Sequence, residues 1–264
     1  MGQKAVFFDV DGTLIDCANG MERVLDSTEQ AITKIKKNGH LAVLATGRPK
    51  SFLDKEITRL KFDAYITSNG AYIEMNGKAL YNRKIDISTL DKVISMCNSE
   101  GIDYIFEGQD LSYVSDFNSN NIKNLLQVFS INPNNLTDIN DSNEISANKM
   151  VLIFNNDRQK KLSISLLEDK FNFMNHPGLS SYDVYFKDCT KADGIKKFAD
   201  NLNISIDNTI AFGDGINDIE MLQTVKYGIA MGNANEKLKK VAYFVTNDVF
   251  SHGIYNGLER LQII

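Results

Sequence analysis

The sequence predicts an α/β fold in which a parallel sheet with flanking helices is interrupted by a second, α+β unit. Apolar runs typical of strands buried on both faces alternate with helical segments up to Thr67, and the same alternation returns after Thr190. Between these regions the strand-like and helix-like segments follow no such order. We therefore expect a core domain, residues 1–82 and 187–264, with an inserted domain over 83–186.

In the first part of the core, strands and helices alternate strictly. The expected order is strand Ala5–Phe8, helix Glu22–Lys37, strand Leu41–Ala45, helix Lys50–Leu60 and strand Ala64–Thr67. Gly39 suits the end of the first helix, and Pro49 suits the first turn of the second. Strands that are joined through helices in this way pair in parallel.

The chain should then turn back on itself. Asn76-Gly77, a strong hairpin signal, lies between the strand-like segments Ala71–Glu74 and Lys78–Tyr81. The inserted domain should follow, with strands at Ile102–Phe106, Leu111–Val114, Lys149–Phe154, Phe171–Asn175 and Tyr182–Phe186, helices near Ile87–Cys97 and Asp157–Glu168, and a polar loop at Asn132–Asn148. The core should resume with helices at Lys191–Asn201, from Asn217 and at His252–Leu261, and strands at Thr209–Phe212, Tyr227–Ala230 and Tyr243–Val245.

The composition is that of an ordinary folded chain. Its 264 residues are 43% hydrophobic and 24% charged, and a net charge of −5 provides no basic field for nucleic acid. No apolar run approaches the roughly 18 residues of a membrane span. Three widely spaced cysteines without a Cys-x-x-Cys pair favour a reduced, cytoplasmic protein. We expect neither nucleic acid nor membrane as a partner, and the sequence does not indicate the oligomeric state.

Polar residues follow three of the core strands at the point where each strand ends. They are Asp9 and Asp11 after the first strand, Thr46, Gly47 and Arg48 after the second, and Asp214, Asn217 and Asp218 after a later one. Ligands of open α/β sheets bind beyond the carboxyl ends of the strands. We therefore expect these side chains to converge at one edge of the sheet.

Four carboxylates at one edge would repel one another. Such crowding raises the pKa of each acid unless a cation neutralises the group, and a hard divalent ion such as Mg²⁺ suits oxygen ligands. Thr46 and Lys191 add a hydroxyl donor and a positive charge, both suited to a phosphoryl group. Each segment alone could be a turn or a capped helix start. Their joint occurrence favours a phosphate-ester site.

These segments resemble the four motifs of the haloacid dehalogenase-like (HAD) hydrolase superfamily. The resemblance is closest to its Cof-like phosphatase branch, which carries a large α+β (type IIB) cap between the second and third motifs. It covers nearly the whole chain and rests on Phe7-Phe8-Asp9-Val10-Asp11-Gly12-Thr13-Leu14, Ala45-Thr46-Gly47-Arg48-Pro49, Thr67-Ser68-Asn69-Gly70-Ala71, Lys191-Ala192-Asp193-Gly194-Ile195, Gly213-Asp214-Gly215-Ile216-Asn217-Asp218 and Gly228-Ile229-Ala230-Met231-Gly232-Asn233-Ala234. It implies a Rossmann-like, doubly wound core and a cap that sets substrate specificity.

The resemblance implies a Mg²⁺-dependent phosphatase of small phosphorylated metabolites, with sugar phosphates as the expected class. Asp9 would attack phosphorus and form an aspartyl-phosphate, and Asp11 would act as general acid and then base. The metal would be held by Asp9, the Asp11 carbonyl and Asp214, with Asp218 ordering its water shell or its ligands. The phosphoryl oxygens would be held by Thr46, Gly47, Lys191 and Asn217.

Two outer residues and two other functions remain as alternatives. Arg48 and Asn69 match family positions near the site and could contact substrate, or could serve only as a helix-flanking residue and a turn residue. A phosphosugar mutase would share the chemistry but return the phosphoryl group to its substrate. A non-catalytic ligand-binding protein would normally have lost Asp9 or Asp11, and both are present.

Overall fold

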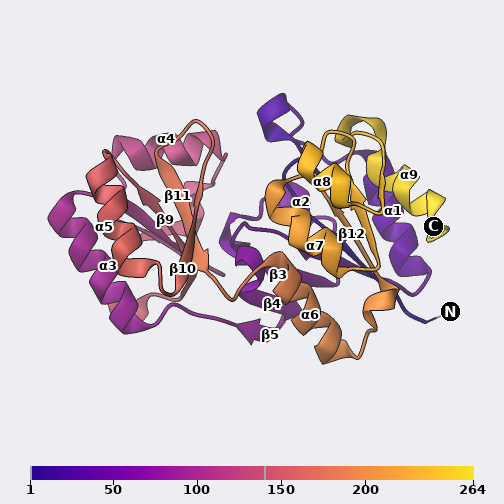
Figure 1. Ribbon diagram of the computed structural model, residues 1–264, viewed down its shortest axis with the longest axis horizontal. Coiled ribbons are helices and arrows are strands. Elements are labelled where there is room, and N and C mark those ends of the chain that lie inside the picture. The colour runs from indigo at the N-terminus through magenta and orange to yellow at the C-terminus, as the bar shows by residue number, and fades with distance from the viewer. Residues whose placement is uncertain (1, 140) are drawn as a thin grey trace. The chain divides into compact units, whose positions relative to one another are not determined.

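A computed structural model describes residues 2–139 and 141–264, which form two compact units (Figure 1). The core unit comprises Met1–Gly47, Asp54–Tyr81 and Thr190–Ile264, and the cap unit comprises Arg48–Leu53 and Asn82–Cys189. Each unit is built on a sheet of its own. The expected fold class, an α/β core with a second, mixed sheet in an inserted cap, is confirmed.

The core unit is built on an eight-stranded sheet. Its strands are β1 (Ala5–Phe8), β2 (Leu41–Ala45), β3 (Ala64–Thr67), β4 (Tyr72–Met75), β5 (Lys78–Asn82), β12 (Thr209–Gly213), β13 (Tyr227–Ala230) and β14 (Phe244–Val245). They lie in the order β14-β13-β12-β1-β2-β3-β4-β5. The strands from β14 to β3 are parallel, whereas β4 pairs antiparallel with β3. The chain winds outward from β1 in both directions, so the carboxyl end of β1 lies at the switch point where such folds bind ligands.

Helices cover both faces of this sheet. They are α1 (Asp26–Lys37), α2 (Lys55–Thr58), α6 (Lys191–Leu202), α7 (Ile219–Thr224), α8 (Glu236–Val241) and α9 (Gly253–Arg260). Successive residues of β1 point to opposite faces. Phe7 packs edge-on against Phe198 of α6 with ring centroids 5.8 Å apart, while Phe8 stacks on Phe212 at 5.5 Å. Gly257 of α9 lies against the Phe212 ring, so α6 and α9 cover opposite faces.

One predicted helix of the core is wrong, and another starts late. The segment Lys50–Leu60 is split into a 3-10 turn at Lys50–Phe52 and the short α2. The Asp54 side chain accepts a hydrogen bond from the Ile57 N–H at 2.9 Å, which caps α2 and starts it as a separate helix. The helix predicted from Glu22 begins instead at Asp26.

The predicted hairpin is confirmed. Strands β4 and β5 are neighbours in the sheet, and the turn between them places Asn76 and Gly77 at φ 50° and 74°. Both values lie in the left-handed region that a tight two-residue hairpin turn requires.

The cap unit is built on a six-stranded mixed sheet in the order β10-β11-β9-β6-β7-β8. Its elements are α3 (Ile87–Glu100), β6 (Asp103–Gly108), β7 (Ser112–Val114), α4 (Asn120–Val128), β8 (Leu136–Asp138), β9 (Ala147–Ile153), α5 (Asp157–Leu167), β10 (Phe171–Asn175) and β11 (Ser181–Phe186). Figure 1 shows α3 and α5 side by side, where Arg158 binds Glu100. On the sheet, α4 packs through Ile122 and Leu125 against a cluster that includes Ile105.

Two elements of the cap unit were not predicted. Helix α4 has no counterpart in the predicted order, and β8 lies within the segment Asn132–Asn148 that was predicted to be a loop. Asn140, in the same segment, lies outside the described residues. Over residues 2–139 and 141–264, no helix combines the length and the hydrophobicity needed to cross a bilayer.

Candidate active site

Three acidic residues meet at the carboxyl ends of β1 and β12. Asp9 follows β1 directly, and its N–H donates to the carbonyl of Phe212 in the neighbouring β12 at 3.1 Å. Asp214 follows β12, and Asp218 lies in the next turn of the chain. Each of the three offers a carboxylate oxygen within 4.8 Å of the other two. Such a set of hard oxygen donors suits Mg²⁺.

Lys191 enters this group from the start of α6. Its ammonium donates to Oδ1 of Asp9 and to Oδ1 of Asp218, at 2.6 Å in each case, and the residue is only 1% exposed. The helix start is defined by a capping box, in which Thr190 and Asp193 each accept a hydrogen bond from the other's backbone N–H. The sequence therefore places the lysine at the first residue of a well-defined helix.

Asp218 organises the loop beyond β12. The residue is fully buried, and its Oδ2 accepts hydrogen bonds from the N–H groups of Asp214 and Gly215, both at 3.0 Å. Its Oδ1 accepts from Lys191. Because both oxygens already accept protein hydrogen bonds, this carboxylate fixes the positions of Asp214 and Lys191.

Asp214 lies directly against the loop that carries Asp9. The Thr13 hydroxyl donates to its Oδ1 at 3.1 Å. Gly12 has φ +80°, and a Cβ atom there would lie 2.1 Å from Oδ2 of Asp214. Glycine is therefore required at position 12 for its backbone conformation and for the close approach of this carboxylate.

A second contact holds the same loop from the C-terminal part of the chain. The Asn233 side chain donates to the Gly12 carbonyl at 2.7 Å and accepts from the Val249 N–H at 3.1 Å. No role was predicted from the sequence for Asn233 or Thr13. Both lie within segments that carry the family resemblance, which was the one signal that could have found them.

The electrostatics of the group favour a bound cation. Burial, followed by the charge of Asp218, raises the pKa of Asp9 well above its usual range, against the opposing effect of Lys191. The same two causes raise the pKa of Asp214 to about 7. Burial alone would lower the pKa of Lys191, but Asp218 and Asp9 outweigh it and raise that pKa. One ammonium thus faces three acids, and a divalent cation would relieve the remaining repulsion.

Thr46 and Gly47 occupy the end of β2, next to β1 in the sheet. Thr46 is 1% exposed, and its N–H donates to the Ile66 carbonyl at 2.9 Å. Its carbonyl accepts from the Asn69 N–H at 3.2 Å. The Asn69 side chain lies over Gly47, where a Cβ atom would be 3.0 Å from its Oδ1. The ends of β2 and β3 are thereby joined.

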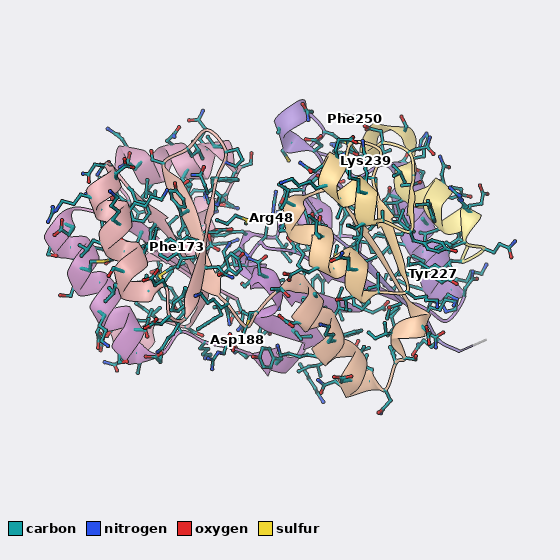
Figure 2. All side chains as sticks on the ribbon, viewed as in Figure 1. Arg48, Phe173, Asp188, Tyr227, Lys239 and Phe250 are labelled. Carbon is teal, nitrogen blue, oxygen red and sulfur yellow. The ribbon has the colours of Figure 1, made fainter. Side chains whose placement is uncertain are left out.

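The remaining candidate residues are Asp11, Asn217 and Arg48. Asp11 and Asn217 are exposed, in the loops beyond β1 and β12. Arg48, labelled in Figure 2, belongs by its contacts to the cap unit. The structure therefore gathers Asp9, Lys191, Asp214 and Asp218 most closely, with Thr46, Gly47 and Asn69 in the same unit.

Four features together define a haloacid dehalogenase-like hydrolase. They are the doubly wound sheet, the acidic loop after β1, the buried lysine at the start of α6 and the two acids after β12. The sequence profile of the haloacid dehalogenase-like hydrolases matches residues 6–258, and the chain belongs to this family. It is a phosphatase of the family's Cof-like branch with a subclass IIB cap, and small phosphorylated metabolites are its substrates.

Three similar proteins illustrate the relationship. The HMP-PP phosphatase of Enterobacter sp. (strain 638) is 29% identical over 267 residues, which cover 96% of this chain and 95% of that protein. A hypothetical protein of Geobacillus kaustophilus HTA426, whose crystal structure is known, is 29% identical with a TM-score of 0.90 and full coverage of both chains. The subclass IIB sugar phosphatase BT4131 is 27% identical with a TM-score of 0.82, covering 99% of this chain and 100% of that one.

Proposed function

We propose that this protein is a Mg²⁺-dependent phosphatase of sugar phosphates that acts through an aspartyl-phosphate on Asp9. The observation that carries the proposal is the buried pair of Asp9 and Lys191 at the end of β1, beside Asp214 and Asp218. Burial disfavours an ionised Asp9, and the ammonium at 2.6 Å favours it. An ionised carboxylate is the form that can attack phosphorus.

Asp9 and Asp11 would divide the reaction into two displacements. In the first, a carboxylate oxygen of Asp9 forms a bond to phosphorus while the ester P–O bond breaks, and Asp11 gives its proton to the leaving alkoxide. In the second, a water molecule loses a proton to Asp11 and its oxygen forms a bond to phosphorus, while the bond between phosphorus and the Asp9 oxygen breaks. Inorganic phosphate leaves, and both aspartates return to their starting states.

The metal would be held by Asp9, the Asp11 carbonyl and Asp214, with Asp218 ordering these groups through the hydrogen bonds described above. Bound Mg²⁺ supplies positive charge that offsets both the carboxylates and the phosphoryl oxygens. Phosphoryl oxygens would be held by the Thr46 hydroxyl, the Gly47 N–H, Lys191 and Asn217. Thr46 and Gly47 support this assignment because they end the strand next to β1.

The inserted domain, residues 83–186, would set which ester enters. Sugar phosphates are the favoured class because the structurally similar BT4131 is a sugar phosphatase with a cap of the same subclass. The similar HMP-PP phosphatase makes phosphorylated heterocycles the comparison class in any substrate test.

The decisive experiment measures phosphate release from a panel of sugar, nucleotide, heterocyclic and aryl phosphates. Wild type should release phosphate with Mg²⁺ and not with EDTA, with sugar phosphates giving the highest kcat/KM. Asp9→Asn should lose at least about 10³-fold in kcat. Asp16→Asn, at a carboxylate of the same loop that caps a turn, should keep activity. Full activity in Asp9→Asn would refute the proposal, and isomerisation of a sugar phosphate without phosphate release would favour the mutase instead.

A further inference from the structure

A strained turn follows β3 at the edge of the sheet that carries the active site. Ser68, Asn69 and Gly70 have φ values of 52°, 55° and 86°, three successive residues in the left-handed region that side-chain-bearing residues rarely adopt. A Cβ atom on Gly70 would lie 2.3 Å from the Thr190 carbonyl. The turn is therefore held between the start of α6 and, through the Asn69 N–H, the carbonyl of Thr46.

The turn carries a buried side-chain donor that has no hydrogen-bond partner among the described residues. Asn69 is 4% exposed, and the Nδ2 donor of its carboxamide has no hydrogen-bond partner among the residues that the structure describes. Within the described residues, three buried side-chain polar atoms lack a hydrogen bond, namely Thr67 Oγ1, Asn69 Nδ2 and Glu107 Oε2. Buried polar groups are normally satisfied, so an unpartnered carboxamide at this position calls for a physical reason.

The need for an asparagine in the left-handed turn does not explain why its side-chain donor is buried without a partner. Asparagine tolerates left-handed backbone, and Asn76 has the same conformation in the β4–β5 hairpin. Asn76 is exposed, however, and its side chain can bind water. Asn69 instead lies against Gly47, where a Cβ atom would be 3.0 Å from Oδ1 and 3.8 Å from Nδ2. The unpartnered Nδ2 therefore lies beside Gly47, the residue whose N–H is proposed to bind the phosphoryl group.

We propose that the Asn69 carboxamide donates a hydrogen bond to the phosphoryl group of the substrate, beside the Gly47 N–H. The inference rests on the phosphatase function proposed above and adds a ligand to the same site. A half-turn about the Cβ–Cγ bond exchanges Nδ2 and Oδ1, so the NH₂ group can face the side on which Oδ1 approaches Gly47. The left-handed turn then serves to hold this donor in place.

The test compares two substitutions at Asn69 that fit left-handed backbone. Asn69→Asp keeps the shape but replaces the donor with an acceptor, and Asn69→Gly removes the side chain. The matched controls are Asn76→Asp and Asn76→Gly, which make the same changes at an exposed left-handed asparagine. Binding of inorganic phosphate is measured calorimetrically with Mg²⁺ present, together with kcat, KM and the thermal midpoint.

Both Asn69 variants should bind inorganic phosphate about 10- to 100-fold more weakly than wild type, the range for a lost hydrogen bond to a charged group. Their kcat/KM should fall at least as much, while the Asn76 variants match wild type. Unchanged phosphate affinity in both Asn69 variants, or no binding by wild type, would overturn the inference. If the Asn69 variants keep full activity while Asp9→Asn is inactive, the role of Asn69 is refuted and the proposed phosphatase function stands. If wild type binds phosphate through Asn69 but hydrolyses no ester, the proposed phosphatase function is refuted and the role of Asn69 stands.

Discussion

The ammonium of Lys191 lies 2.6 Å from Oδ1 of Asp9, although the two residues are 182 positions apart in the chain. The contact joins the end of the central strand β1 to the first residue of α6. Both side chains are buried, so neither charge has water to stabilise it. The pair therefore contributes both to the integrity of the core unit and to the charge state of the proposed nucleophile.

Lys191→Met should reduce both stability and activity. It leaves Asp9 and Asp218 buried without their cation, and removal of one partner from a buried ion pair typically costs about 3–5 kcal/mol of unfolding free energy. We expect kcat to fall at least about 10²-fold. Urea denaturation and phosphate release check the two effects. Lys196→Met, at an exposed position on the same helix, should change neither. Wild-type stability in Lys191→Met would contradict the assigned role.

Binding of Mg²⁺ should strengthen as the pH rises from 6 to 8. Burial and Asp218 raise the pKa of Asp214 to about 7, so below that pH the metal must displace a proton. The affinity should rise by up to about 10-fold per pH unit below pH 7 and level off above it. Calorimetry in two buffers of different ionisation enthalpy measures the affinity and counts the released protons. A pH-independent affinity without proton release would rule out this linkage.

Gly12→Ala should abolish activity through steric conflict in addition to backbone strain. Its Cβ atom would lie 2.1 Å from Asp214, whereas a Cβ on Gly77, which also has positive φ, would meet nothing within 4 Å. Gly77→Ala should therefore show only the strain of the left-handed region, about 1–2 kcal/mol of unfolding free energy. Gly12→Ala should lose more stability and bind Mg²⁺ more weakly. Equal effects of the two substitutions on stability and Mg²⁺ affinity would argue against the close approach of Asp214.

A buried charge cluster in the cap unit should make its stability depend on pH. Lys149 donates to Asp183 at 2.7 Å and lies 3.1 Å from Oε2 of Glu107 without making a hydrogen bond to it, while His176 lies 3.3 Å from Asp183. Burial raises the pKa of Glu107 from its ordinary value of 4.5 to about 7. The folded state thus holds a proton that the unfolded state releases, so this contribution to stability is present below pH 4.5 and is lost as the pH rises through 7.

Glu107→Gln should remove that loss because glutamine does not ionise. From pH 5 to pH 8 the unfolding free energy of the variant should gain on that of wild type by on the order of 2–3 kcal/mol. Urea denaturation at both values measures the difference. In Glu168→Gln, at an exposed position in the same unit, the unfolding free energy should change with pH as it does in wild type. If the unfolding free energy of Glu107→Gln also changes with pH as that of wild type does, Glu107 is ionised in the folded protein throughout this range.

The central strands and the hairpin were predictable because their determinants are local. A parallel strand buried on both faces is a continuous apolar run, and the runs Ala5–Phe8, Leu41–Ala45 and Ala64–Thr67 match β1, β2 and β3 residue for residue. The acidic segments could be located for the same reason, since they follow those runs directly. Their order along the chain already indicated a common edge of the sheet.

The missed features depend on contacts or on weak local signals. Helix α4 begins in an asparagine-rich stretch and buries only Ile122 and Leu125, so its apolar pattern is short. The hydrogen bonds of Thr13 to Asp214 and of Asn233 to Gly12 link residues 201 and 221 positions apart. Spacing in one sequence cannot reveal such pairs, because either partner alone resembles an ordinary loop residue.

The central position of β1 has a consequence for how the protein is made. Its two neighbours in the sheet are β2, which follows soon after, and β12, which begins at Thr209. At a synthesis rate of roughly 5–20 residues per second, the second edge of β1 waits on the order of 10–40 seconds for its partner to leave the ribosome. During that interval the whole cap unit is synthesised, and the nascent chain carries an apolar strand with one open edge. Such an edge invites pairing with other chains, so the yield of folded protein should depend on chaperones that shield the first forty-five residues.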